Sequence, residues 1–261
     1  MISVVLPAYE EEENLRIILP RLKAQMDGTG APYEILVVDS RQAMDGTREV
    51  CLQNSVKCLE RENADTYGDA VRTGIARAAG EHILFMDADG SHPPEFIPRL
   101  CEFKEECDVV IASRYVTGGS TENNMALTLM SLTVNVLYSL VLGLNCRDVS
   151  TSFKLYRAQP LKRLSLSCDN FDIIEEMLFK LKKSDCRIKE IPFAFKQRMF
   201  GKTKRNLFLF ALSFLFTLLK LRCGNRWQNM LPWKREPIVG MKAPALTRLD
   251  PARDNKHPRE P

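Results

Sequence analysis

Short apolar runs alternate with stretches of helical spacing through the first 113 residues, and this alternation constrains the fold more than any other feature of the sequence. The apolar runs occupy residues 2–6, 33–39, 56–59, 82–86 and 108–113. Between them, helical spacing covers 10–26 and 67–79, and Pro94 stands where it can begin a further helix. Strands that are apolar throughout and separated by helices predict a parallel sheet covered on both faces. The expected fold class is therefore α/β, with a mostly parallel, Rossmann-like sheet flanked by helices.

Acidic side chains follow two of the predicted strands. Asp39 ends the run 33–39, and Asp87 and Asp89 come directly after the run 82–86. In open parallel sheets, ligands bind beyond the carboxyl ends of the strands. Two carboxylates separated by one residue suit Mg²⁺ or Mn²⁺, which take oxygen ligands and commonly share substrate phosphates. The sequence therefore predicts a divalent-cation site here, and such a cation would neutralise the charge of the leaving group if that group is a nucleoside diphosphate.

The second half of the chain changes character. Residues 125–144 carry no charged side chain, and residues 207–219 are almost wholly apolar. Residues 171–183 have the pattern of an amphipathic helix, and residues 187–195 predict a pair of strands broken at Pro192. A C-terminal helix with an apolar surface is therefore expected to follow the α/β core.

The two apolar stretches raise the question of a membrane. Thirteen helical residues rise about 20 Å, which is short of a hydrocarbon core of about 30 Å. Basic residues flank 207–219, and Trp227 follows, which suits a helix lying in the membrane interface. We expect short helices, partly buried and partly facing lipid. A membrane span at 125–144 and a buried packing helix at 207–219 are the alternatives.

The formal net charge of +4 is concentrated at the C-terminal end. From residue 222 onward there are nine Lys or Arg against four Asp or Glu, so residues 1–221 are near neutral. A basic, Pro-rich tail of this kind is typically disordered. Because the body is neutral and the tail lacks an aromatic stacking platform, nucleic acid is not an expected partner.

The cysteines and the N-terminal residues both favour a cytosolic protein. None of the eight cysteines is spaced as CxxC, which argues against a zinc site or a redox pair and favours reduced, buried thiols. Residues 1–6 are apolar but lack a basic region, and glutamates follow at once, so no signal peptide is expected.

Seven motifs occur in an order that resembles the family-two glycosyltransferases. They are Pro7-Ala-Tyr-Glu-Glu11, Val37-Val-Asp39, Asp45-Gly-Thr47, Asp87-Ala-Asp-Gly-Ser-His-Pro-Pro94, Ser113-Arg-Tyr115, Asp148-Val-Ser-Thr-Ser-Phe-Lys154 and Arg198-Met-Phe-Gly-Lys-Thr-Lys204. The last two are similar to the branch that includes dolichyl-phosphate mannosyltransferase and bacterial polyprenyl-phosphate glycosyltransferases. The resemblance covers residues 1–221 and implies a GT-A fold, a nucleotide-sugar donor and inverting transfer.

The resemblance also implies roles for individual residues. Nucleotide-sugar binding falls to Pro7, Tyr9, Glu11, Asp39, Asp87, Ala88 and Lys204. Metal binding falls to Asp87, Asp89 and, as a weaker contact, Ser91. The catalytic set is Asp89, Arg114, Arg198 and Asp148, with the arginines contacting donor or acceptor phosphates. The chain has Ser40 where the family usually has a second acid, which leaves the nucleobase open.

Charge favours a lipid phosphate as the acceptor. A sugar hydroxyl generally needs a positioned base, whereas a phosphate is already an anionic nucleophile that needs positive groups to receive it. Arg114, Arg198 and Lys204 supply these, while Asp148 and Glu175 are the candidates if a base is required. The expected function is metal-dependent transfer of a sugar to a polyprenyl phosphate, by an enzyme attached peripherally to the cytoplasmic face of a membrane.

Other functions are distinguished by acceptor or by sequence pattern. A saccharide or cell-surface glycan acceptor is the first alternative, and a noncatalytic membrane-binding module is the second. A nucleotidyltransferase is disfavoured because the segment after the first strand is acidic rather than Gly-rich and basic. The sequence leaves open whether a membrane protein or a second copy of the chain is a partner.

Three segments follow from these patterns. Residues 1–205 are expected to form the catalytic domain, with 125–144 on its acceptor side. Residues 206–222 are expected to form the interfacial helix, and residues 223–261 the basic tail.

Overall fold

The computed structural model describes residues 1–201 and 207–223, with side chains of the last helix described from Phe214 onward. Residues Met1–Gly224 form one compact unit. The predicted phosphate contact Lys204 and residues 224–261 of the predicted basic tail lie outside the described residues.

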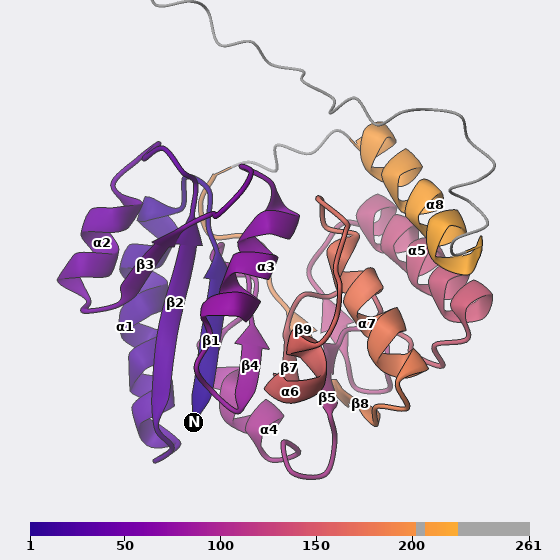
Figure 1. Ribbon diagram of the computed structural model, residues 1–261, viewed down its shortest axis with the longest axis horizontal. Helices are drawn as coiled ribbons and strands as arrows, with labels where there is room; N and C mark the ends of the chain where they lie inside the picture. The colour runs from indigo at the N-terminus through magenta and orange to yellow at the C-terminus, as the bar shows by residue number, and fades with distance from the viewer. Residues whose placement is uncertain (202–206, 224–261) are drawn as a thin grey trace, which may run out of the picture. The chain divides into compact units, whose positions relative to one another are not determined.

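A seven-stranded sheet forms the centre of this unit, in the order β3-β2-β1-β4-β7-β5-β8 (Figure 1). Its strands are β1 (Ile2–Pro7), β2 (Tyr33–Asp39), β3 (Lys57–Glu60), β4 (His82–Phe85), β5 (Val109–Ser113), β7 (Lys154–Arg157) and β8 (Ile188–Pro192). All neighbours are parallel except β7, which runs antiparallel to both β4 and β5. The predicted α/β fold with a mostly parallel sheet is confirmed.

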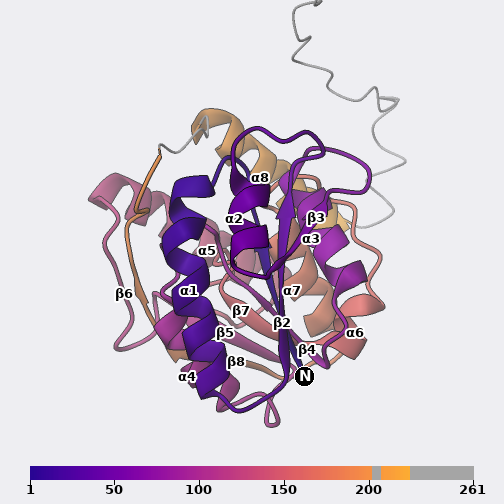
Figure 2. The same cartoon turned by 90° about the vertical axis from the view of Figure 1, so that its left-hand side faces the viewer.

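Helices cover both faces of this sheet, as Figures 1 and 2 show. One face packs against α1 (Glu12–Gly28), α2 (Thr47–Gln53), the short 3₁₀ turn η1 (Pro94–Phe96) and α4 (Ile97–Cys101). The other packs against α3 (Tyr67–Arg77), α6 (Ala158–Lys162) and α7 (Ile173–Lys183). Successive residues of β1 belong to opposite faces, Val4 and Leu6 to the first core and Val5 to the second, because side chains alternate along a strand.

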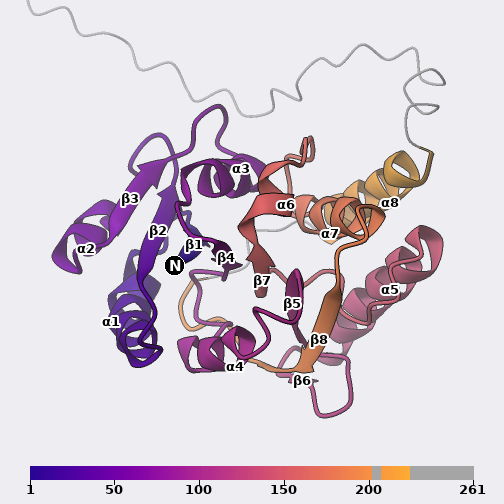
Figure 3. The ribbon, with the colours of Figure 1, turned by 60° about the horizontal axis from the view of Figure 1, so that its bottom comes forward.

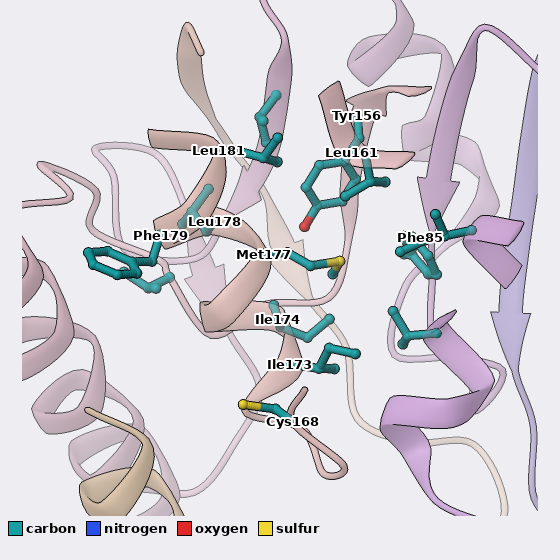
Figure 4. Packing of buried hydrophobic residues seen from close by; sticks show 14 of the residues in the cluster. Phe85, Tyr156, Leu161, Cys168, Ile173, Ile174, Met177, Leu178, Phe179 and Leu181 are labelled. Atoms are coloured by element: carbon teal, nitrogen blue, oxygen red, sulfur yellow. The ribbon is translucent and has the colours of Figure 1, made fainter. Parts of the chain in front are cut away.

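The larger core gathers around α7. Ile173, Ile174 and Met177 project from this helix toward Phe85 of β4 and Tyr156 of β7 (Figure 4). Phe85 and Tyr156 meet edge to face, with 6.0 Å between ring centroids. This packing fixes β7 between the two parallel parts of the sheet.

The helices α5 (Met125–Leu142) and α8 (Leu207–Cys223) lie side by side at one end of the unit (Figures 1 and 3). The Tyr138 hydroxyl donates a hydrogen bond of 2.6 Å to the Phe214 carbonyl oxygen. The sequence predicted short helices over residues 125–144, but the structure has one continuous helix. It ends at Gly143, whose φ of +64° is a left-handed cap.

Each of these two helices has a buried side and an exposed side. On α8, Phe214 and Leu218 join the core, whereas Leu215 and Leu219 are exposed. On α5, Leu129 and Leu140 are 67% and 76% exposed. Among the described helices, α5 is long and apolar enough to cross a membrane by length and composition, with 11% of it buried.

A separate two-stranded ribbon joins β6 (Ser120–Thr121) to β9 (Ala194–Phe195) in parallel. The pair of strands predicted over residues 187–195 is therefore present, but its second strand has left the main sheet. The ribbon directs the chain after β9 back toward the carboxyl end of β4. Lys196 donates its backbone N–H to the Ser91 carbonyl oxygen at 3.2 Å.

Candidate active site

The loop after β4 holds Asp87 in a fixed place. The Asp87 backbone N–H donates to His92 Nδ1 at 2.9 Å, and the Ser152 hydroxyl donates to Asp87 Oδ1 at 2.8 Å. Burial lowers the pKa of His92, so the ring is neutral and its Nδ1 can accept this bond. The ring stacks on Phe153 with 4.8 Å between centroids. His92 therefore supports the backbone of the acidic loop.

Asp89 divides its two carboxylate oxygens between different partners. Its Oδ1 accepts from the backbone N–H and the hydroxyl of Ser91, at 3.0 and 2.6 Å. Its Oδ2 accepts from Arg198 Nε at 3.2 Å. Burial raises the pKa of Asp89, but the Ser91 hydrogen bonds and the Arg198 charge lower it, and the net direction is downward. Ser91, predicted as a weaker metal contact, is buried, and its hydroxyl donates to Asp89 and orients that carboxylate.

Arg198 bridges two acids from distant parts of the chain. A terminal nitrogen of its guanidinium donates to Glu11 Oε1 at 2.9 Å, while Nε holds Asp89. Asn14 donates to the other oxygen of Glu11 at 2.6 Å. Burial raises the pKa of Glu11.

The backbone that follows Arg198 is also fixed. Met199 N–H donates to the Asp89 carbonyl oxygen at 2.9 Å, and Phe200 N–H donates to Asn14 Oδ1 at 3.1 Å. Gly90 has φ of +83°, and a Cβ there would lie 2.6 Å from Met199 Cγ. The acidic loop and the Arg198 segment are thus packed too closely for a side chain at position 90.

Arg114 and Asp148, both predicted as catalytic, are paired with each other. Arg114 follows β5, and its Nε and a terminal nitrogen donate to the two Asp148 oxygens at 2.8 and 2.7 Å. Its backbone N–H donates to the same carboxylate at 2.8 Å. Burial lowers the pKa of Arg114, but Asp148 raises it above its ordinary value. Because Asp148 is wholly buried and committed to Arg114, the geometry favours a supporting task over proton abstraction.

Glu175, the other candidate base, is not exposed at the site. It lies in α7 and is wholly buried, and neither of its carboxylate oxygens has a hydrogen-bond partner in the structure. Burial raises its pKa to about 8. The structure therefore places Glu175 in the core rather than beside Asp87 and Asp89.

The ends of β1, β2 and β3 form a second part of the site. Tyr9 follows β1 and is 42% exposed, and the Arg61 guanidinium lies 5.7 Å from its ring centroid. Asp39, at the end of β2, is buried with its Oδ2 3.8 Å from Arg48 Nε. Both Asp39 Oδ2 and Arg61 Nε are buried without a hydrogen-bond partner in the structure. Such orphaned polar atoms suit the polar edge of a bound nucleoside.

Arg61 is a site residue that the sequence reasoning missed. It follows the third strand, so the rule that selected Asp39 could have selected it as well. A terminal nitrogen of Arg61 donates to the Ala8 carbonyl oxygen at 2.7 Å. Burial lowers its pKa. Pro7 and Ala88 are buried at the ends of β1 and β4, where they shape the backbone between these side chains.

The acids fit a divalent cation that shares its ligands with a substrate. In residues 1–201 and 207–223, no group of three or more His, Cys, Asp or Glu is arranged to hold a metal ion. Mg²⁺ commonly binds through one or two carboxylates plus substrate phosphates, and Asp87 and Asp89 provide that pair. A positive group already faces Asp89, since Arg198 lies against its Oδ2. The residues present therefore fit a cation that arrives together with a phosphorylated donor.

Comparison with known families agrees with this arrangement. The model of glycosyl transferase family 2 matches residues 3–165, which include β1 to β5, the acidic loop and Asp148. The chain belongs to glycosyl transferase family 2. The predicted family membership, made from seven short motifs, is thereby confirmed.

Three relatives with curated names are similar to this chain over most of its length. Dolichol-phosphate mannosyltransferase of Pyrococcus furiosus is 32% identical over 210 residues, which is 78% of this chain and 58% of that protein. Undecaprenyl-phosphate mannosyltransferase of Micrococcus luteus is also 32% identical, over 78% of this chain and 86% of that protein. Polyprenol monophosphomannose synthase of Mycolicibacterium smegmatis is 30% identical, over 77% and 79%. The chain thus spans little more than half the length of the archaeal relative.

Solved structures of more distant enzymes share the fold. Glucosyl-3-phosphoglycerate synthase from Mycobacterium tuberculosis, with Mn²⁺, UDP and phosphoglyceric acid, has a TM-score of 0.67 and 21% identity. The match covers 86% of this chain and 78% of that one. The same enzyme with Mg²⁺ and UDP has a TM-score of 0.66. At this identity the likeness shows the fold alone.

Proposed function

We propose that this protein transfers a sugar from a nucleotide-sugar donor to a polyprenyl phosphate, with inversion at the anomeric carbon. The observation that carries the proposal is the Arg198 guanidinium lying against Asp89, two residues after Asp87, beyond the carboxyl end of β4. An anionic donor and an anionic acceptor both need positive charge there. The names of the relatives, which are mannosyltransferases acting on polyprenyl or dolichol phosphates, support this acceptor class.

The nucleotide of the donor lies at the ends of β1 to β3. Tyr9 offers a half-exposed ring, and Asp39 and Arg61 offer buried polar atoms to a base or ribose. Asp87 and Asp89 would hold a divalent cation together with the donor diphosphate. When bound, Mg²⁺ or Mn²⁺ neutralises the negative charge that develops on the departing nucleoside diphosphate.

The acceptor phosphate needs no general base. Its oxygen attacks the anomeric carbon as the bond to the donor diphosphate breaks, and the nucleoside diphosphate leaves with the bonding electrons. Arg198 is proposed to supply positive charge on the acceptor side by exchanging Glu11 and Asp89 for the phosphate, with Arg114 supporting this side from its pair with Asp148. Guanidinium groups suit this task because they contact phosphate through two N–H donors. Lys204, outside the described residues, is proposed to contact a phosphate as well.

The apolar side of α5 and α8 is proposed to lie against a membrane. Leu129 and Leu140 of α5 and Leu215 of α8 are more than half exposed. Burying such side chains in the acyl boundary is favourable, and a polyprenyl chain is itself dissolved there. We propose peripheral attachment to the cytoplasmic face, where nucleotide sugars are available.

Transfer is tested with the full chain, vesicles containing polyprenyl phosphate, and a panel of labelled nucleotide sugars with Mg²⁺ or Mn²⁺. Label is expected in an organic-extractable fraction that mild acid releases. Asp89→Asn is expected to lower transfer about 100-fold or more, because a carboxylate ligand of the cation that neutralises the leaving group is lost. Asp185→Asn is the control, since Asp185 is exposed in a turn after α7.

Three results would each overturn a part of the proposal. Label found only in water-soluble or polymeric glycan would exclude the lipid-phosphate acceptor and favour a saccharide acceptor. Near-full transfer by Asp89→Asn in added metal would exclude the role of the acid pair. A chain that binds vesicles but no nucleotide sugar would be a noncatalytic membrane module.

A further inference from the structure

The loop of residues 148–152, here named the bridging loop, touches the site through every second side chain. Asp148 accepts two side-chain hydrogen bonds from Arg114, and the Ser150 hydroxyl accepts a third at 2.9 Å. The Ser152 hydroxyl donates to Asp87 Oδ1. One short segment therefore supports both an arginine on the acceptor side and one of the two acids on the donor side.

Lys154 holds the two residues that lie between Asp148, Ser150 and Ser152. Its side chain is wholly buried at the start of β7, and its ammonium donates to the carbonyl oxygens of Val149, at 2.8 Å, and Thr151. The alternation is complete: residues 148, 150 and 152 face the site, and residues 149 and 151 present their carbonyl groups to the lysine. The ammonium thus fixes the backbone on both sides of Ser150.

A buried lysine is costly, so its retention needs a compensating interaction. Burying an ammonium without partners is strongly unfavourable, and burial here lowers the pKa of Lys154 to about 8. The charges that raise it most are those of Glu175 and Asp148. A leucine or methionine would fill the same space without this cost, but it could not hold two carbonyl groups.

The bridging loop is also attached to α5 and β8 by hydrogen bonds that do not involve Lys154. Ser150 N–H donates to Asn135 Oδ1 of α5 at 2.9 Å. Asp148 N–H donates to Glu190 Oε1 of β8 at 2.8 Å. Loss of the lysine is therefore expected to loosen the loop locally while the loop remains attached at both neighbours.

We propose that Lys154 is a positioning residue: its ammonium holds the bridging loop so that Ser152 fixes Asp87 while Asp148 and Ser150 fix Arg114. Lys154 itself touches neither substrate. The inference rests on the proposed function in one respect, because the kcat used to test it is that of sugar transfer.

Lys154→Met tests this, with Lys162→Met as the matched control. Lys162 also donates its ammonium to a backbone carbonyl, that of Ala78, but lies in α6 away from the bridging loop. Lys154→Met is expected to lower kcat 10-fold to 100-fold, the order of loss that a misplacement of about 1 Å produces. The KM of the donor is expected to change less than kcat does, because the nucleotide is proposed to be held by Tyr9, Asp39 and Arg61 at the ends of β1 to β3, away from the bridging loop. Lys162→Met is expected to leave kcat within twofold of the unchanged protein.

Rescue and a second variant separate positioning from general destabilisation. Lys154→Arg keeps a charge and two or more N–H donors, and is expected to recover at least tenfold of the kcat lost in the methionine variant. If Lys154→Met does not fold, Ser152→Ala serves instead. It removes only the hydrogen bond between the Ser152 hydroxyl and Asp87, and it is also expected to lower kcat. An unchanged kcat in Ser152→Ala, or in folded Lys154→Met, would overturn the proposal.

Hydrogen exchange gives a readout that needs no acceptor. The amides of residues 148–152 are expected to exchange faster in Lys154→Met than in the unchanged protein. Their exchange rates are expected to stay the same in Lys162→Met. Unchanged exchange in the first variant would overturn the positioning role even if no transfer to lipid phosphate were found. Failure of the unchanged protein to glycosylate polyprenyl phosphate would instead contradict the proposed function and leave this readout valid.

Discussion

Asp89 is held by two partners with different consequences. Ser91 orients its Oδ1 with neutral donors, while Arg198 places a positive charge on its Oδ2 and on Glu11. A cation shared by two carboxylates stabilises both in their ionised form. Arg198 therefore places positive charge beside the acids where a divalent cation is proposed to bind.

Arg198→Gln is expected to have opposite effects on metal binding and on transfer. Removal of the guanidinium leaves Glu11 and Asp89 without their shared positive partner, so Mn²⁺ is expected to bind more tightly, on the order of tenfold or about 1.4 kcal/mol. Transfer is expected to fall because a phosphate contact is lost. Direct Mn²⁺ titration followed by electron paramagnetic resonance measures the first effect. Arg187→Gln, at an exposed arginine after α7, is the control, and Mn²⁺ binding no tighter than in that control would contradict the prediction.

Some site residues could be predicted from the sequence because strand ends locate them. Asp39 and Asp87 follow apolar runs, and the sheet brings such ends to one edge. The Arg114–Asp148 pair joins residues 34 positions apart, and no local pattern encodes that contact. Lys154 illustrates the same limit, since a lysine in a motif reads as a surface charge until its burial is known.

Helix α5 keeps its continuity despite the polar residues within it. The Thr133 hydroxyl donates to the Leu129 carbonyl oxygen at 2.9 Å, so this hydroxyl bonds within its own helix. Asn135 faces inward and accepts from Ser150 N–H. The polar residues that weakened the hydrophobic pattern over 125–144 are therefore accommodated, while the opposite side of the helix remains apolar and exposed.

Leu140→Glu is expected to weaken binding to vesicles about tenfold or more. The side chain is 76% exposed on α5, and its transfer into lipid would contribute about 1.5–3 kcal/mol that a carboxylate loses. Co-sedimentation with anionic vesicles measures this, and nucleotide affinity is expected to be unchanged. Leu52→Glu makes the same change at an 80% exposed leucine of α2. Equal loss in both variants would show that α5 is not the membrane-facing element.

Element boundaries were predicted well where strands were long and apolar. The run 33–39 matches β2 to the residue, and the other four strand predictions are within a residue or two at each end. The four residues of β7 were missed because they directly follow a loop and alternate Lys, Leu, Tyr and Arg. The reversed direction of β7 depends on where the chain returns to the sheet, and the spacing of apolar residues does not predict that point.

Global stability is expected to depend on pH through Glu175. Burial raises its pKa from 4.5 to about 8, so the folded protein keeps a proton that the unfolded chain has lost between these values. The contribution of this group is therefore fully present below pH 4.5 and is lost as pH rises toward 8. The slope for one proton is about 1.4 kcal/mol per pH unit.

Glu175→Gln removes this dependence. Relative to the unchanged protein, the variant is expected to gain free energy of unfolding as pH rises from 5 to 8, as measured by urea denaturation at both values. Glu13→Gln, at an exposed glutamate of α1, is expected to show no such gain. An equal difference at the two pH values in Glu175→Gln would contradict the assignment of a buried, protonated carboxyl.

At the scale of the whole unit, the fold class followed from alternation of strands and helices, but the order of the sheet did not. Nothing local tells β4 to pair with β7 rather than with β5, since that choice depends on how α7 packs on Phe85 and Tyr156 (Figure 4). The helix α8 packs into the same core. The compact unit therefore includes the helix that was predicted as a separate interfacial segment.

The reversed strand β7 has a consequence for how such an enzyme can diversify. It separates β3-β2-β1-β4, where we propose that the nucleotide binds, from β5, which Arg114 follows, and from β8, which carries Glu190. Because the bridging loop lies before β7, a substitution in the loop that keeps its contacts with Lys154 leaves the register of β7 against β4 unchanged. Donor preference and acceptor preference can therefore change through substitutions on different sides of β7, while the Ser152–Asp87 hydrogen bond and the Arg198 ion pairs hold the two sides together.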